Sequence, residues 1–81
     1  MSISVEALAA RLREAFADGI VEADGDGYHF QVAVTSPVFA GLRPVQRQQK
    51  VYAVVQDWIA SGELHALSIQ TRTPDEAGSA S

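Results

Sequence analysis

The sequence predicts a small α+β domain of two layers, with helices packed on one face of a three-stranded mixed sheet in the order α-β-β-α-β. Three observations support this fold class. Residues 4–17 and 44–61 repeat apolar side chains at helical spacing. Two Asp-Gly pairs at 24–27 mark a hairpin between two strand-like runs. A strand, helix, strand passage then follows, which favours parallel pairing of its two strands.

The size of the chain allows a single domain. With 81 residues, of which 47% are hydrophobic and 20% charged, it has enough apolar surface for one core and no room for a second. We expect one domain over residues 1–76. The last residues, 75-DEAGSAS-81, are small and polar, which predicts a frayed end and a flexible tail over 77–81.

The first predicted helix begins after Ser4, a favourable N-cap residue, and stops near Gly19. Its apolar face consists of Val5, Leu8, Leu12, Ala15 and Phe16. Its polar face carries Arg11, Arg13 and Glu14. A short strand follows at residues 20–23. Asp24 and Asp26 look like an acidic pair, but aspartate in a glycine-rich turn favours local backbone hydrogen bonds over catalysis.

Residues 28–35 alternate as a half-buried strand does. The pattern predicts that one face carries Tyr28, Phe30, Val32 and Val34 toward the core. The other face then carries His29, Gln31, Ala33 and Thr35 toward solvent.

A connector over residues 37–44 follows this strand, with Phe39 as an apolar anchor. Pro44 suits the first turn of a second helix that is expected to run to Ser61. The apolar stripe of this helix is Val51, Tyr52, Val55, Trp58 and Ile59, all expected in the core. Gly62 ends the helix, residues 64–72 form the third strand, and Pro74 closes it.

The charge and residue content exclude several kinds of function. A net charge of −4, from 10 acidic and 6 basic residues, opposes generic nucleic-acid binding. The absence of cysteine removes disulfides, catalytic thiols and thiolate metal ligands. No nucleophile and base occur at a recognisable spacing, so we do not expect an enzyme. No run of residues is long and apolar enough for a membrane span, and we expect a cytoplasmic protein.

The basic residues Arg43, Arg47 and Lys50 form a cluster at the start of the second predicted helix. Arg47 and Lys50 are three residues apart and therefore share one helix face. Such a cluster is often only the solvated side of a helix. It could also dock an acidic partner or a phosphate group.

Four motifs give the chain a more specific resemblance. They are YHFQVAV at 28–34, VFAGL at 38–42, RQQKVY at 47–52 and LHALSIQTRTP at 64–74. In this order and spacing they resemble the BolA-like family, in particular its IbaG-like branch, over residues 3–76. The resemblance implies a fold similar to the type II K-homology domain. The nucleic-acid-clamping GxxG loop of K-homology domains is missing, so RNA binding does not follow.

The resemblance also implies a function. Members of this family act with a monothiol glutaredoxin to bind or transfer a [2Fe-2S] cluster, whose thiolates come from the glutaredoxin and glutathione. The BolA-like partner supplies histidine, as the mixed ligation of Rieske centres allows. The matching ligands here are His65 and, as a second, His29. The chain alone is expected to hold no cofactor, and its free state to be a monomer or weak homodimer. The alternative role in the family is a DNA-binding regulator of stress response and cell morphology.

The residues themselves leave both histidines open to a simpler interpretation. His65 shares parity with Leu67 and Ile69, so it is expected to point toward the apolar face, as a core or rim residue. His29 is expected on the wet face, where a plain exposed histidine is an ordinary finding. Gln48 replaces a histidine that many family members carry after the arginine of the second helix, so no role passes to that position.

Overall fold

The structure of the chain, a computed structural model, describes residues 3–79. Its elements follow the predicted order with three additions: a short 3-10 turn, a divided second helix and a terminal helix. They are α1 (Val5–Ala15), β1 (Ile20–Gly25), β2 (His29–Thr35), the 3-10 turn η1 (Pro37–Phe39), α2 (Pro44–Val54), α3 (Gln56–Ser61), β3 (Ala66–Arg72) and α4 (Pro74–Ser79). Within residues 3–79, no helix has the length and apolar character that crossing a membrane requires.

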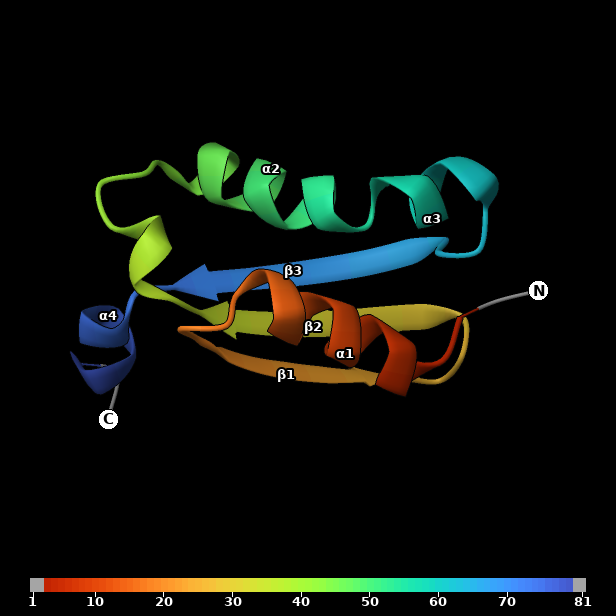
Figure 1. Cartoon of the computed structure of the whole chain (residues 1–81), viewed down its shortest axis with the longest axis horizontal. Helices are drawn as coiled ribbons and strands as arrows, with labels where there is room; N and C mark the ends of the chain where they lie inside the picture. The colour runs from red at the N-terminus through yellow and green to blue at the C-terminus, as the bar shows by residue number, and fades with distance from the viewer. Residues whose placement is uncertain (1–2, 80–81) are drawn as a thin grey trace.

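The sheet is mixed, which confirms the predicted α+β fold class. β2 lies in the centre, antiparallel to β1 and parallel to β3. α1 and α2 lie on one side of this sheet, and α4 lies at the end of the sheet where β3 finishes (Figure 1). The parallel register pairs His29 with Ala66 and Phe30 with Leu67, so the β1–β2 turn lies beside the start of β3.

The core lies between the sheet and the helices. β2 alternates along its length as the sequence predicted, with Phe30, Val32 and Val34 buried and His29 and Gln31 exposed. The buried cluster is Ile3, Leu8, Leu12, Phe16, Val21, Phe30, Val32, Val34, Phe39, Val51, Val55 and Leu64. Helices cover the apolar side of the sheet. The other side faces solvent and carries exposed residues such as Gln31 and Gln70.

The second predicted helix is not continuous, which corrects the expectation of one helix from residue 44 to 61. It breaks at Val55, whose φ of −115° and ψ of 16° depart from helical values. The N–H of Trp58 donates to Val55 O at 3.0 Å, and Arg11 of α1 donates to the carbonyl of Val54 at 3.4 Å. Val55 itself is fully buried, so the break seats this residue in the core.

Two residues expected in the core lie at the surface instead. Tyr52 and Ile59 are 38% and 39% exposed, so the apolar stripe that contacts the core is narrower than the sequence indicated. Trp58 is half-buried, and its ring carries the Arg11 guanidinium at 3.5 Å from its centroid. Arg11, expected on the free polar side of α1, therefore joins α1 to α3, and it also pairs with Asp57 at 2.6 Å.

The predicted frayed end is helical as far as Ser79, and residues 80–81 of the predicted tail lie outside the described residues. Thr73 and Glu76 explain the start of α4. The backbone N–H of Thr73 donates to Glu76 Oε1 at 2.8 Å, and the N–H of Glu76 donates to Thr73 Oγ1 at 3.2 Å. This reciprocal pair caps the first turn of a helix.

Candidate functional site

The β1–β2 turn is built around Asp26. Its Oδ1 accepts hydrogen bonds from the backbone N–H groups of Tyr28 at 2.9 Å and His29 at 2.8 Å. Gly27 has a φ of +94°, a conformation that favours glycine. The two hydrogen bonds, that from His29 first, hold the pKa of the Asp26 carboxyl below its ordinary value. The expectation that this aspartate serves the turn through backbone hydrogen bonds is confirmed.

Tyr28 brings the two predicted ligand histidines together. Since His29 pairs with Ala66, the preceding residues Tyr28 and His65 lie side by side at the start of the parallel strands. The Tyr28 and His65 rings stack with centroids 5.4 Å apart and planes 19° apart. The Tyr28 and His29 rings meet edge to face at 5.0 Å. We call Tyr28, His29 and His65 the histidine rim.

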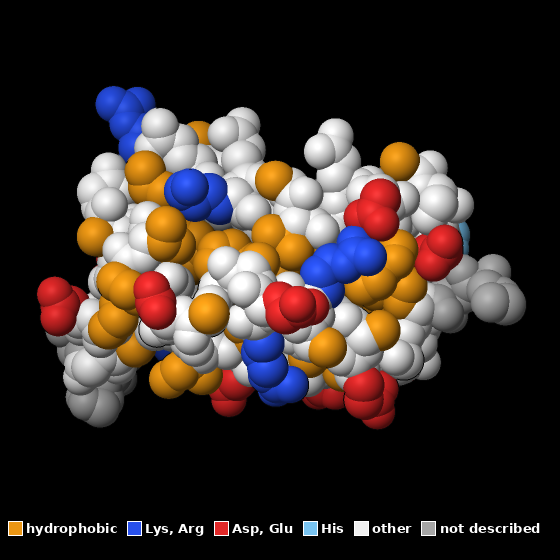
Figure 2. Space-filling model, in the orientation of Figure 1, with side chains coloured by type: hydrophobic (Ala, Val, Ile, Leu, Met, Phe, Trp, Pro, Cys, Tyr) orange, Lys and Arg blue, Asp and Glu red, His pale blue; other side chains and the backbone are white. Residues whose placement is uncertain are grey.

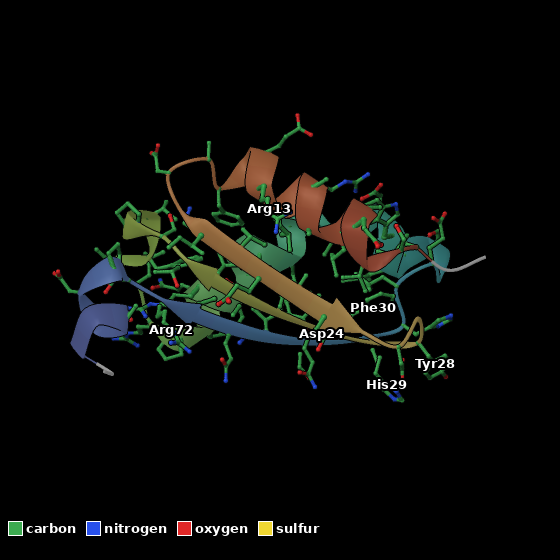
Figure 3. The ribbon with its side chains drawn as sticks, turned by 90° about the horizontal axis from the view of Figure 1, so that it is seen from below. Arg13, Asp24, Tyr28, His29, Phe30 and Arg72 are labelled. Carbon is green, nitrogen blue, oxygen red and sulfur yellow. The ribbon has the colours of Figure 1, made fainter. Side chains whose placement is uncertain are left out.

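The histidine rim is exposed, which corrects two expectations. Tyr28, predicted to face the core, is 59% exposed, because it precedes β2 and lies beyond the end of the covered sheet (Figure 3). His65, predicted to point toward the apolar face, is also exposed. It precedes β3, and the neighbouring Leu64 takes the buried position at 1% exposure. Parity therefore fails at both residues because neither lies within a strand.

The two imidazoles have different neighbours. The Nδ1 of His29 lies 3.7 Å from Asp26 Oδ2, close enough for an ion pair when the ring is protonated. In residues 3–79, no hydrogen bond or ion pair to the exposed His65 imidazole is found, so no protein group in this range competes for its nitrogens. Across this same range, no group of three His, Asp or Glu side chains is placed to hold a metal ion.

The basic cluster is divided by the fold. Arg47 donates to both carboxylate oxygens of Glu76, at 2.8 and 3.2 Å, and to the Leu42 carbonyl at 3.0 Å. Its side chain is only 14% exposed, and this pairing holds the pKa of Glu76 below its ordinary value. Arg43 and Lys50 are exposed. On the face in Figure 2, Lys and Arg side chains are interspersed with Asp and Glu.

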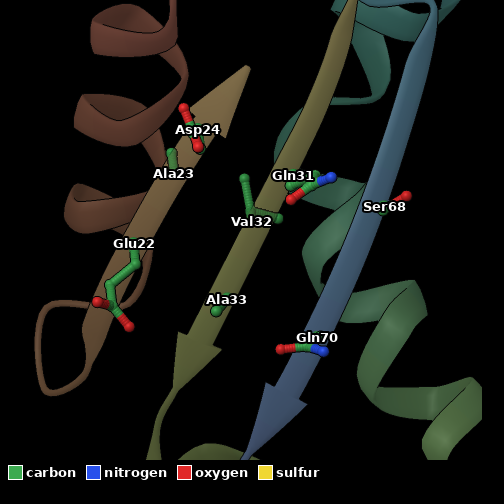
Figure 4. A pocket seen from close by; sticks show the side chains of 8 residues that line it. All are labelled: Glu22, Ala23, Asp24, Gln31, Val32, Ala33, Ser68 and Gln70. Atoms are coloured by element: carbon green, nitrogen blue, oxygen red, sulfur yellow. The ribbon is translucent and has the colours of Figure 1, made fainter.

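The open side of the sheet carries a shallow depression that the sequence did not single out. Its volume is about 630 Å³, and all three strands line it (Figure 4). The lining side chains are Glu22, Ala23, Asp24, Gln31, Val32, Ala33, Ser68 and Gln70. The exposed polar members Glu22, Gln31, Ser68 and Gln70 follow from strand parity, because they alternate with buried or half-buried residues. His29 lies on this same face of β2, two residues before Gln31.

These features define the class of protein: a small α+β domain with a three-stranded mixed sheet and exposed imidazoles beside a hairpin turn. The sequence model of BolA-like proteins matches residues 5–76. The chain therefore belongs to the BolA-like family.

Relatives and solved structures agree with this assignment. A protein of Acinetobacter guillouiae from the rpoN-murA intergenic region is 42% identical over 71 residues, or 88% of this chain and 86% of that one. The acid stress protein IbaG of Escherichia coli K12 is 43% identical over 56 residues, or 69% and 67% of the two chains. A BolA homologue of Coxiella burnetii superposes with a TM-score of 0.81 at 31% identity, covering 94% of this chain and 97% of its own. These likenesses support the IbaG-like branch that the motifs indicated.

Proposed function

We propose that this chain is a non-enzymatic adaptor of iron–sulfur cluster assembly or trafficking. In this proposal it acts in the cytoplasm as a heterodimer with a monothiol glutaredoxin. The observation that carries the proposal is the exposed His65 imidazole, which stacks on Tyr28 and has no hydrogen bond or ion pair within residues 3–79. A [2Fe-2S] cluster is the cargo of the complex rather than a resident group of this chain.

The donor set of the rim fits a shared cluster. A chain without cysteine cannot bind such a cluster through thiolates of its own. Imidazole is a suitable ligand for iron when other ligands are thiolates, as in Rieske centres. His65 would supply one imidazole, and the glutaredoxin cysteine and glutathione would supply sulfur. His29 would be the second imidazole, with Asp26 orienting its ring as carboxylates often orient ligand histidines.

Docking would use the cations that remain at the surface. Arg43 and Lys50 are exposed and would attract a partner surface or the carboxylates of glutathione. Arg47 would contribute only indirectly to docking, because its guanidinium is largely buried and already paired with Glu76. The DNA-binding alternative relies on the same three residues. Because Arg47 is paired with Glu76, only Arg43 and Lys50 of these three remain exposed for a phosphate backbone. Within residues 3–79, we find no feature that favours that alternative.

The proposal is tested by titrating the protein into glutaredoxin loaded with a [2Fe-2S] cluster and glutathione under anaerobic conditions. Visible absorption and circular dichroism report the ligands of the cluster. Wild-type protein is expected to shift both spectra. His65→Ala is expected to remove the shift, whereas His29→Ala should reduce it and Gln70→Ala, on the open sheet face, should leave it intact. A His65→Ala variant that shifts the spectra as wild type does would disprove the ligand assignment.

A further inference from the structure

Tyr28 has a position that the hydrophobic core does not explain. The residue is 59% exposed, so little of its ring is held by packing in the interior. The ring nevertheless contacts both imidazoles of the histidine rim. Its backbone is anchored by the hydrogen bond to Asp26, which fixes where the side chain leaves the turn. Tyr28 is thus a surface residue with a defined place beside two histidines.

The stack on His65 covers the ring in a particular way. Centroids 5.4 Å apart with planes at 19° describe an offset parallel stack, in which part of one face of the imidazole is covered. The two nitrogens of imidazole bind metal in the plane of the ring, and the stack therefore leaves them free. A flat contact on the ring face restricts rotation of the ring without blocking its edge.

Gly62 lies beside that edge. A Cβ atom at position 62 would lie 3.9 Å from Cε1 of His65, the carbon between the two ring nitrogens. Gly62 also has a φ of +82°, which ends α3 in the left-handed conformation. The residue that terminates the helix therefore adds no side chain of its own near the metal-binding edge of the imidazole.

We propose that Tyr28 is the positioning residue of the histidine rim. By stacking, it fixes the ring plane of His65 so that its nitrogens face outward, and its edge contact with His29 sets the place of the second imidazole. A ring that is ordered before the partner arrives loses less freedom on binding. This inference rests on the proposed function, since it assigns to Tyr28 the presentation of the cluster ligand.

The first test uses the free protein and needs no cluster. The ring protons of His65 are followed by nuclear magnetic resonance in wild type, Tyr28→Phe and Tyr28→Ala. A stacked aromatic ring shields the protons beneath it, so Tyr28→Ala is expected to move the His65 signals downfield. Tyr28→Phe keeps the ring and should preserve the signals, as should Tyr52→Ala, which removes an exposed tyrosine from α2. His65 signals that stay in place in Tyr28→Ala would overturn the inference.

The second test measures the affinity for cluster-loaded glutaredoxin. Tyr28→Ala is expected to bind about two- to tenfold more weakly, the usual cost of ordering one more side chain, while Tyr28→Phe should match wild type. If His65→Ala changes the cluster spectra and Tyr28→Ala binds as wild type does, the positioning role fails although the proposed function stands. If neither variant changes spectra or affinity, the proposed function itself fails.

Discussion

At the scale of single residues, the neighbours of a side chain decide what the site can do. His65 and His29 are both exposed imidazoles, yet His29 has a carboxylate 3.7 Å away and His65 has a stacked ring and a glycine. Parity along the strands could not predict this difference. The contacts arise where the hairpin turn meets the start of a strand 37 residues later, a pairing set by the parallel register.

Asp26 gives a prediction about the order of the rim. Replacing it with Ala removes the acceptor of the Tyr28 and His29 backbone N–H groups, which should loosen the turn and both rings. The amides of residues 28 and 29 should then exchange with solvent faster than in wild type. Asp26→Asn keeps an acceptor oxygen and should show a smaller increase.

Asp18→Ala, an exposed aspartate outside the turn, is the matched control for Asp26→Ala. It should leave the exchange of both amides unchanged. Equal exchange in Asp26→Ala and wild type would mean that the turn is held by other contacts.

At the scale of elements, the sequence predicted what local patterns determine. Hydrophobic periodicity placed the first helix, and alternation placed the central strand, because each pattern is repeated over several residues of one segment. The break at Val55 was missed because it depends on Arg11 and on burial in the core. The terminal helix was missed because the small polar residues after Pro74 gave no periodic signal, while its stabilising partner, Arg47, lies in another helix.

Arg47 gives the prediction at this scale. Arg47→Met keeps the apolar stem but removes the hydrogen bonds to Glu76 and to the Leu42 carbonyl. We expect a lower Tm and faster amide exchange in α4, because the helix loses its attachment to α2. The exposed Arg43→Met is the matched control and should change neither quantity. Unaltered exchange in α4 would show that capping by Thr73 and Glu76 is sufficient to hold it.

At the scale of the whole molecule, a chain of 81 residues has a small margin of stability, roughly 4–12 kcal/mol from typical values per residue. One well-buried aromatic residue is then a large fraction of the total. The predicted anchor Phe39 is fully buried, and its ring lies 5.6 Å from that of Phe16. Phe39 thereby joins η1 to the C-cap residue of α1.

Phe39→Ala should lower the free energy of unfolding by about 3–5 kcal/mol, from lost burial and the cavity left behind. Urea denaturation at neutral pH measures this change. The neighbouring Val38 is 45% exposed, and Val38→Ala should cost well under that amount. A loss below about 1 kcal/mol for Phe39→Ala would mean that the core closes around the gap.

Acid stability is a property of the whole chain, because three carboxyls far apart in the fold have lowered pKa values. The backbone N–H of His29 lowers the pKa of Asp26, and side-chain hydrogen bonds from Arg11 and Arg47 lower the pKa values of Asp57 and Glu76. A carboxyl whose pKa is lowered in the folded state stabilises the fold at any pH above its ordinary pKa, which is 3.8 for Asp and 4.5 for Glu. That stability is lost as the pH falls through the folded-state value.

The sign of these shifts predicts how the fold responds to acid. From these three groups, stability should be constant near neutral pH and decline as the pH drops below about 5. Urea midpoints between pH 7 and pH 3 measure the decline. The triple variant Asp26→Asn, Asp57→Asn and Glu76→Gln should be less stable at pH 7 and should lose less on acidification. A control with Glu6→Gln, Glu14→Gln and Asp18→Asn, three exposed carboxyls of the α1 region, should keep the wild-type slope. If the variant of Asp26, Asp57 and Glu76 has the same urea midpoints as wild type at every pH, these three carboxyls do not cause the acid sensitivity, which must then arise from other groups.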